Sequence, residues 1–120
     1  MPLERPEVDF PEREEPTELV ITDLVTGDGK PAESGDDVVV HYVGVEFVSG
    51  EEFDASWNRG KPASISLRGL ITGWQEGIPG MRVGGRRELI VPPEQAYGTD
   101  SGHRLAGKTL IFVIDLLESS

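Results

Sequence analysis

The chain of 120 residues is long enough for one domain with a buried core and too short for two. It contains no cysteine, which excludes a disulfide framework and a thiol nucleophile and fits a reducing compartment. The 22 acidic side chains against 11 Lys and Arg give a formal net charge of -11, which argues against nucleic-acid binding through phosphate contacts.

Residues 1–17 form an acidic arm with four prolines and two isolated apolar side chains, Val8 and Phe10. So little apolar area favours a solvated arm over one that packs Val8 and Phe10 on the body, residues 18–120. We therefore expect deletion of residues 1–16 to leave turnover within about twofold. The arm lacks the pattern of a secretory signal, and no stretch reaches the roughly 18 apolar residues of a membrane span. The sequence predicts a cytoplasmic protein without a membrane partner.

From Glu18 onward, five segments rich in β-branched and aromatic residues are separated by Gly, Pro, Asp and Ser. They predict strands of a mostly antiparallel sheet at LVITDLV (19–25), DVVVHYVGVEFV (37–48), ASISL (63–67), RRELIV (86–91) and TLIFVIDLL (109–117). In the last segment every second residue from Leu110 to Leu116 is apolar, whereas the opposite face carries Thr109, Val113 and Asp115. This alternation predicts a sheet with one buried side.

Ser-Gly at 49–50 supplies a hairpin turn, and the segment EEFDASWNRGKP that follows has neither the period of a strand nor that of a helix. It nevertheless keeps two aromatic rings, Phe53 and Trp57, and an opposite-charge pair, Asp54 and Arg59. Rings and a charge pair in a loop predict the wall of a binding site. The alternative for the charge pair is a surface ion pair worth about 0 to 1 kcal/mol.

One helix is predicted, at residues 70–78. Leu70, Trp74 and Ile78 are spaced by four on one face, and Pro79-Gly80 ends the pattern. A helix of about two turns is not stable alone in water, so it has to lie on the sheet. We therefore expect Trp74 to face the concave side of the sheet.

Motifs for covalent, phosphate or metal chemistry are missing from the sequence. There is no nucleophile elbow and no phosphate loop, and GDGK at 27–30 lacks the frame of a calcium loop. His41 and His103 are far apart and have no partner at helical spacing, so we predict no metal site and no cofactor. His41 is expected on a strand face.

Five segments, in this order and spacing, resemble a known family. They are VVHYVG, EEFDASWNRGKP, LITGWQEGIPGM, VGGRRELIVPPEQAYG and TLIFVIDLL. Over about residues 19–118 the chain resembles the FKBP-type peptidyl-prolyl cis–trans isomerases, the immunosuppressant-binding immunophilins. The resemblance implies an α+β fold in which a twisted antiparallel sheet of five or six strands wraps around one short helix, with the active pocket between them.

The resemblance also implies the residues of this pocket. Its catalytic side chains would be Tyr42, Asp54, Trp74, Tyr97 and Phe112. Its substrate-binding residues would be Phe53, Arg59, Leu70, Ile71, His103 and Leu105. Trp74 would form the floor, and Asp54 would pair with Arg59 and Tyr42 to hold one wall. The alternative for Trp74 is plain core packing, and a buried hydroxyl of Tyr42 or Tyr97 could bond the backbone instead.

Two features depart from the family pattern. After Lys61-Pro62 the family commonly has a large aromatic residue, whereas this chain has Ala63, which predicts an open wall. The loop after Tyr97 is shorter than usual and lacks a proline pair before the last strand, where His103 and Leu105 are the counterparts of rim residues.

The function implied by the resemblance is a cytoplasmic, monomeric prolyl isomerase that acts on X–Pro bonds of folding chains. Its partners would be Pro-containing polypeptides, with an apolar residue preferred before proline, and the macrolide inhibitors rapamycin and tacrolimus. Two alternatives remain: a non-catalytic module that holds a Pro-containing segment in the same groove, and a structural β-domain whose aromatic residues are core.

Overall fold

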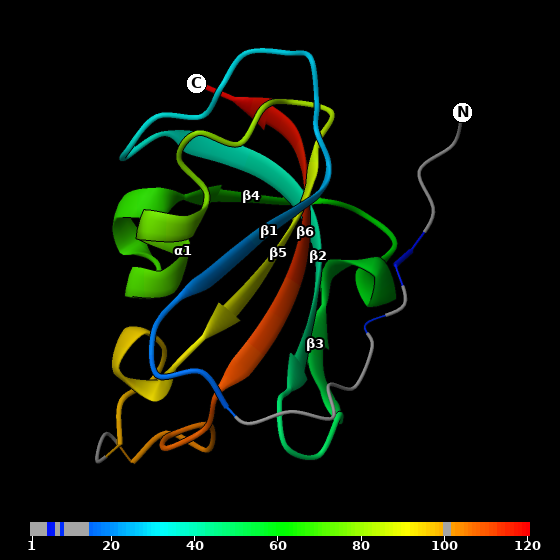
Figure 1. The fold of residues 1–120 in the computed structure, drawn as a ribbon. Helices are drawn as coiled ribbons and strands as arrows, with labels where there is room; N and C mark the ends of the chain where they lie inside the picture. Colours follow the sequence, from blue (N-terminus) through cyan, green and yellow to red (C-terminus); the bar gives the residue numbers. More distant parts are fainter. Residues whose placement is uncertain (1–4, 7, 9–14, 100–101) are drawn as a thin grey trace.

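A twisted antiparallel sheet curves around one short helix in the computed structural model, which describes residues 5–6, 8, 15–99 and 102–120 (Figure 1). The strands of this part of the chain are β1 (Val20–Val25), β2 (Asp37–Glu46), β3 (Glu52–Ala55), β4 (Ala63–Ser66), β5 (Arg86–Val91) and β6 (Leu110–Ser119). Its helical segments are α1 (Thr72–Gly77) and the 3-10 turns η1 (Ser56–Arg59), η2 (Leu67–Gly69) and η3 (Pro93–Gln95). The predicted fold class is confirmed.

The order of the strands explains why the segment after the hairpin looks irregular. The sheet runs β1-β5-β6-β2-β3, and β4 also pairs with β2. One edge of β2 pairs with β6, while the other edge pairs with β4 at residues 37–40 and with β3 at residues 43–45. β3 and β4 are therefore two halves of one strand position, and residues 56–62 leave the sheet between them. The hairpin predicted at 49–50 joins β2 to β3, with Gly50 at a φ of 73°.

The helix is shorter than predicted and lies very close to β5. It begins at Thr72 because Ile71 has an extended backbone (φ -58°, ψ 150°). A Cβ added to Gly73 would meet Val91 at 2.5 Å, and one added to Gly77 would meet Leu89 at 2.7 Å. Glycine at both positions therefore permits the approach that brings Trp74 and Ile78 into the core on the concave face.

The expectation that only one side of the sheet is buried was wrong for the central strand. Val113 is 1% exposed and Asp115 is 2% exposed, although both lie on the face predicted to be open. Strand β6 lies between β5 and β2, and a second cluster, called the outer cluster below, covers its other face. The outer cluster contains buried Val43, Val45, Phe47, Ala55, Ile90 and Ile111, with Val8, Val20 and Trp57 packed against them. A loop and the N-terminal segment supply this cover, which strand alternation cannot predict.

The packing of Val8 on the outer cluster differs from the solvated arm favoured by composition. Phe10, the other apolar residue considered, lies outside the described residues. Within the described ranges, no helix is both long enough and apolar enough to cross a membrane.

Candidate functional site

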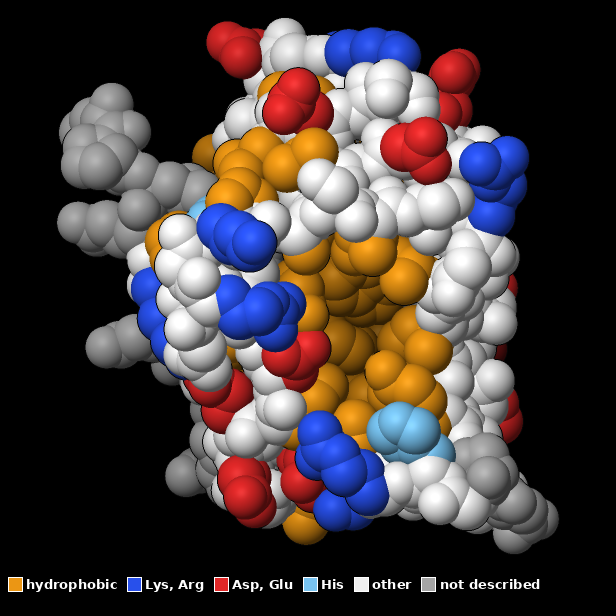
Figure 2. Space-filling view, turned by 180° about the vertical axis from the view of Figure 1, so that it is seen from behind, with side chains coloured by type: hydrophobic (Ala, Val, Ile, Leu, Met, Phe, Trp, Pro, Cys, Tyr) orange, Lys and Arg blue, Asp and Glu red, His pale blue; other side chains and the backbone are white. Residues whose placement is uncertain are grey.

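A cavity of about 280 Å³ opens between α1 and the concave face of the sheet. Its lining consists of Tyr42, Phe53, Asp54, Arg59, Ala63, Ile65, Leu70, Ile71, Trp74, Tyr97 and Phe112. Figure 2 shows it as a hollow lined with hydrophobic side chains in the middle of this face, with basic and acidic side chains along its edge. These residues come from β2, β3, η1, β4, β6, α1 and the loop after η3, so only the folded sheet brings them together.

Four aromatic rings define the interior of the cavity. Trp74 is 4% exposed and meets Tyr42 and Phe112 edge to face, with ring centroids 5.3 Å apart in each pair. Phe53 meets Phe112 edge to face at 5.6 Å. Edge-to-face contacts fix the orientation of each ring against the next, so the apolar walls are rigid before any ligand binds.

The indole nitrogen of Trp74 is buried and has no hydrogen-bond acceptor among the described residues. An unsatisfied buried donor costs about 1–3 kcal/mol, so stability alone does not favour tryptophan at this position. The indole nitrogen of Trp57, which does not line the cavity, is also buried without an acceptor among the described residues, so this feature alone does not separate a pocket floor from core packing. The position of Trp74 in the cavity lining favours the floor.

Tyr42, Asp54 and Arg59 are hydrogen-bonded to one another at one wall. The hydroxyl of Tyr42 donates to Oδ2 of Asp54 at 2.5 Å, and Arg59 donates to Oδ1 of Asp54 at 3.1 Å and to the Tyr42 oxygen at 3.0 Å. Each of the three side chains thus contacts the other two, and the wall is held across the gap between β2 and the end of η1.

The same hydrogen bonds set the protonation states of this wall. Partial burial on its own raises the pKa of Asp54, but hydrogen bonds from Tyr42 and Arg59 outweigh it and hold that pKa below its ordinary value. Burial, together with the bond to Asp54, raises the pKa of Tyr42. At neutral pH the carboxylate is charged and the phenol neutral, which is the combination that the observed bonds require.

The backbone supplies one further polar group at the cavity. The N–H of Ile71, just before α1, donates to no acceptor in the described part of the chain. A free N–H beside an apolar hollow can donate a hydrogen bond to an acceptor on a ligand, such as a peptide carbonyl.

Two predicted site residues do not line the cavity. His103 stacks on the ring of Tyr97, with centroids 4.0 Å apart and an angle of 8°. Leu105 is 2% exposed within the main core, and its N–H donates to Nδ1 of His103 at 3.0 Å. Both residues support the loop that carries Tyr97, and direct contact of either with a substrate stays a prediction.

Sequence reasoning missed two residues that shape the cavity. Ile65 lies two residues after Ala63 on β4 and lines the same wall, a position that the period of two could have indicated. Gly44 lies behind Phe53 and Phe112, where an added Cβ would come within 2.6 Å of Phe53 and 3.1 Å of Phe112. Its lack of a side chain leaves room for both rings, which only the packed structure reveals.

Trp57 is not part of the cavity, although its loop was predicted to form a wall. Its ring stacks on His41 on the outer side of the sheet, with centroids 4.0 Å apart and an angle of 15°. His41 is a strand-face residue, as predicted, and its Nδ1 lies 2.8 Å from the hydroxyl of Ser56. The loop therefore has two sides: Asp54 and Arg59 face the cavity, and Trp57 faces the outer cluster.

Among the described residues, the cavity lining contains no Ser, Thr, Cys, Lys or His, and no three His, Cys, Asp or Glu side chains could together hold a metal ion. The lining offers ring faces, aliphatic groups, one charge pair and a free N–H. Such an arrangement can hold an apolar, ring-sized part of a ligand and can donate hydrogen bonds to neighbouring carbonyls.

The comparisons with known proteins agree with this class of site. A family model described as FKBP-type peptidyl-prolyl cis-trans isomerase matches residues 28–117. The chain is 55% identical to a probable FK506-binding protein of Corynebacterium glutamicum, over 98% of this chain and 100% of the relative. It is 54% identical to the FK506-binding protein of Streptomyces anulatus, over 98% of each. The crystal structure of FkpA from Escherichia coli matches with a TM-score of 0.79 and 39% identity, over 85% of this chain and 48% of that one.

The chain therefore belongs to the FKBP-type peptidyl-prolyl cis–trans isomerases. The resemblance identified from the sequence segments is confirmed.

Proposed function

We propose that the cavity binds the proline of an X–Pro segment and catalyses rotation of the X–Pro bond by non-covalent stabilisation of the twisted amide. The observation that carries this proposal is the ring-walled hollow over Trp74, which suits a pyrrolidine ring and whose described lining contains no Ser, Thr, Cys, Lys or His.

The physical chemistry of the bond suits such a site. Rotation breaks amide resonance over a barrier of roughly 18–20 kcal/mol, and the uncatalysed event takes tens to hundreds of seconds. The twisted amide is less polar across its C–N bond than the planar amide. An apolar cavity that excludes water favours the twisted state over the ground state, so differential binding alone accelerates the reaction.

The polar groups at the edge would hold the substrate chain while the bond turns. The N–H of Ile71 would donate to a substrate carbonyl on one side of proline, and the hydroxyl of Tyr97, a residue that lines the cavity, would donate on the other. The bonds among Tyr42, Asp54 and Arg59 keep the intervening wall rigid. Fixing both sides of the proline converts binding energy into a constraint on the rotating bond.

The partners of the site would be Pro-containing polypeptides with an apolar residue before proline, including folding chains, and the macrolides rapamycin and tacrolimus. The names of the two bacterial relatives, which refer to FK506 binding, support the macrolide part. We place the activity in residues 18–120 of a cytoplasmic monomer. The extent of the family match supports the domain, and the absence of cysteine fits a reducing compartment.

A non-catalytic module is the second candidate, because a cavity lined mainly by aromatic and aliphatic side chains also suits simple binding of a Pro-containing segment. A protease-coupled isomerisation assay on an Xaa-Leu-Pro-Phe peptide separates the two functions. Turnover above the thermal rate supports the enzyme if rapamycin abolishes this excess. Rapamycin binding without turnover supports the module and contradicts our proposal.

A further inference from the structure

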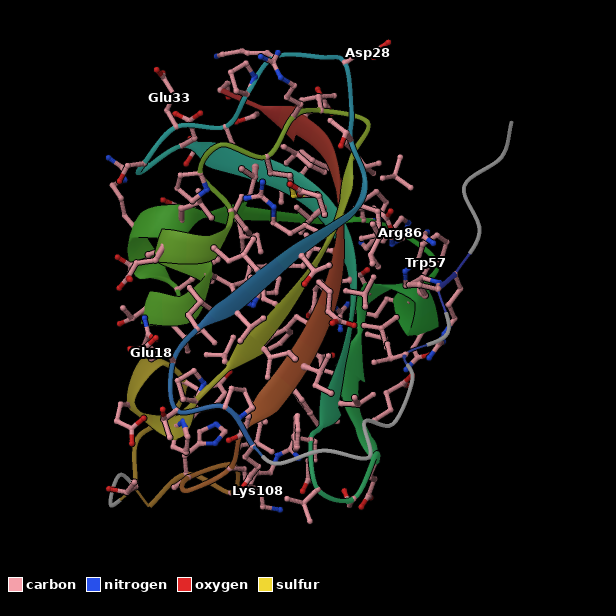
Figure 3. All side chains as sticks on the ribbon, viewed as in Figure 1. Glu18, Asp28, Glu33, Trp57, Arg86 and Lys108 are labelled. Atoms are coloured by element: carbon pink, nitrogen blue, oxygen red, sulfur yellow. The ribbon has the colours of Figure 1, made fainter. Side chains whose placement is uncertain are left out.

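The loop that carries the charged wall of the cavity is held from both sides. On the cavity side, Arg59 bonds Asp54 and Tyr42. On the outer side, Asn58 of η1 is hydrogen-bonded to Arg5, and Trp57 packs on the outer cluster, as Val8 does. Figure 3 shows the labelled Trp57 on the side of the sheet away from α1. The sheet ladder does not hold residues 56–62. Ser56 is bonded to Tyr42 and His41 at the start of this segment. The side-chain contacts of Trp57, Asn58 and Arg59 hold the residues after it.

Arg5 connects η1 of this loop to strand β3. Its guanidinium donates to Oδ1 of Asn58 at 2.8 Å and also to Oε1 of Glu52. The amide of Asn58 in turn donates to Oε2 of Glu52 at 2.9 Å. The three side chains form a closed set of bonds that ties η1 to β3, directly behind the residues that face the cavity.

Val8 makes the second contact from the same segment. It packs against the outer cluster together with Trp57, whose ring is fixed by its stack on His41. His41 lies on β2, next to Tyr42 of the cavity wall. Arg5 and Val8 thus make two contacts on the outer side: Arg5 bonds Asn58 of η1, and Val8 packs on the cluster against which Trp57 also packs.

We propose that Arg5 and Val8 are positioning residues that hold the loop at 55–62 against the sheet, so that Asp54 and Arg59 keep their place in the wall. The activity part of this inference rests on the proposed function. Arg5 and Glu52 are 41% and 33% exposed, and exposed ion pairs contribute little to global stability. Their effect is therefore local, on a loop with few backbone bonds. This replaces the expectation that loss of the arm leaves activity nearly unchanged.

The polar contact is tested by reversing its charges. Arg5→Glu and Glu52→Arg are each expected to raise KM by about three- to tenfold with kcat nearly constant, because a displaced wall weakens binding of both the ground and the transition state. The double variant Arg5→Glu/Glu52→Arg restores the ion pair and should recover most of the loss. Lys30→Ala, which removes an exposed cation from the loop before β2, is the matched control and should leave KM unchanged. Single variants that match the control, or a double variant without recovery, would overturn the proposal.

The apolar contact has its own pair of variants. Val8→Ala should raise KM by about two- to fivefold by removing packing on the outer cluster, against which Trp57 also packs. Val48→Ala removes the same atoms from a side chain that is 69% exposed, and should have no effect. Equal KM values for the two variants would contradict a role for Val8.

Hydrogen exchange at the amides of residues 56–60 makes the inference separable from the proposed function. Exchange there should become about three- to tenfold faster in Arg5→Glu and return in the double variant, whether or not the protein is an enzyme. If the unmodified chain has no turnover while exchange responds in this way, the proposed function fails and the clamp on the loop stands. If turnover is present, two results would overturn the positioning role. One is faster exchange in Arg5→Glu with an unchanged KM, and the other is an unchanged exchange rate.

Discussion

At the scale of single residues, Trp74 links the core to the site. Its ring belongs to the main core cluster, lines the cavity and keeps a buried N–H without an acceptor among the described residues. The buried N–H has a cost that packing alone does not require. One substitution that removes the ring and one that keeps a ring but removes the N–H therefore test the two roles separately.

Trp74→Ala should lower the free energy of unfolding by about 3–5 kcal/mol and remove most rapamycin affinity, because it leaves a cavity beneath the ligand. Trp74→Phe, the matched variant, keeps an aromatic floor without the N–H and should retain most of the affinity. Urea unfolding and calorimetric titration measure the two quantities. An alanine variant that binds rapamycin normally would show that Trp74 is not the floor.

The charged wall predicts a dependence on pH. Because the pKa of Asp54 is depressed in the folded protein, its carboxylate fully stabilises the folded wall above the ordinary carboxyl pKa of about 4. This stabilisation is lost as pH falls through the lower pKa of the folded protein. Rapamycin affinity should therefore be constant at neutral and mildly acidic pH and decline only in strong acid. Tyr42→Phe removes the hydrogen bond from the phenol and should raise the pKa of Asp54, measured by NMR titration of its carboxyl carbon. An unchanged titration midpoint in Tyr42→Phe would contradict the role of that bond.

At the scale of elements, local patterns predicted the strands and the hairpin well but not how the elements are covered. The period of two along 109–117 located β6, yet it assigned Asp115 to an open face, whereas this side chain is 2% exposed and paired with Arg86 of β5. The period of four found Trp74 and Ile78 but placed the start of the helix too early, because an extended Ile71 has the same apolar character as a helical one. Residue patterns report periodicity and burial, whereas cover from a distant segment depends on tertiary contacts.

Strand β4 provides a test of the open wall predicted at Ala63, which does line the cavity. Ala63→Phe should cover on the order of 50 Å² more of a macrolide and strengthen binding by about 1 kcal/mol, or roughly five- to tenfold. Ser64→Phe points its ring to the other face of the strand and is the matched control. Weaker binding with a lower melting temperature would mean that neighbours already fill the space at a cost of about 1–3 kcal/mol.

Strand β5 anchors the helix through Arg87, which is 8% exposed. Its guanidinium donates to the carbonyl of Gly77 at the end of α1 at 2.8 Å and to both carboxylate oxygens of Asp23 on β1 at 2.7 and 3.2 Å. Arg87→Met should lower the free energy of unfolding by about 1–3 kcal/mol, since the helix carbonyl loses its partner. Arg87→Lys keeps the charge without the two-pronged guanidinium, and its free energy of unfolding should lie between those of Arg87→Met and the parent. Urea unfolding checks both, and a methionine variant as stable as the parent would contradict the anchoring role.

At the scale of the whole molecule, the site is a product of the closed sheet. Tyr42, Phe53, Trp74, Tyr97 and Phe112 are spread over most of the chain, and no local pattern joins them. Their grouping was predicted through the family resemblance, whereas the position of Ile65 and the space left by Gly44 needed the packed structure. The orientation of Trp57 toward the outer side also needed the packed structure, because it follows from the stack of its ring in η1 on His41 of β2.

The central claim is that the cavity turns X–Pro bonds and does not merely hold them. Exchange NMR on a short Leu-Pro peptide with a catalytic amount of protein measures this directly. Uncatalysed rotation takes tens to hundreds of seconds, so a mixing time of about 0.5 s gives no cross-peaks between cis and trans signals without catalysis. We predict cross-peaks when the protein is present and their loss when rapamycin is added at an equimolar amount to the protein. Peptide signals that shift or broaden without such cross-peaks, or cross-peaks that survive saturation with rapamycin, would contradict the account.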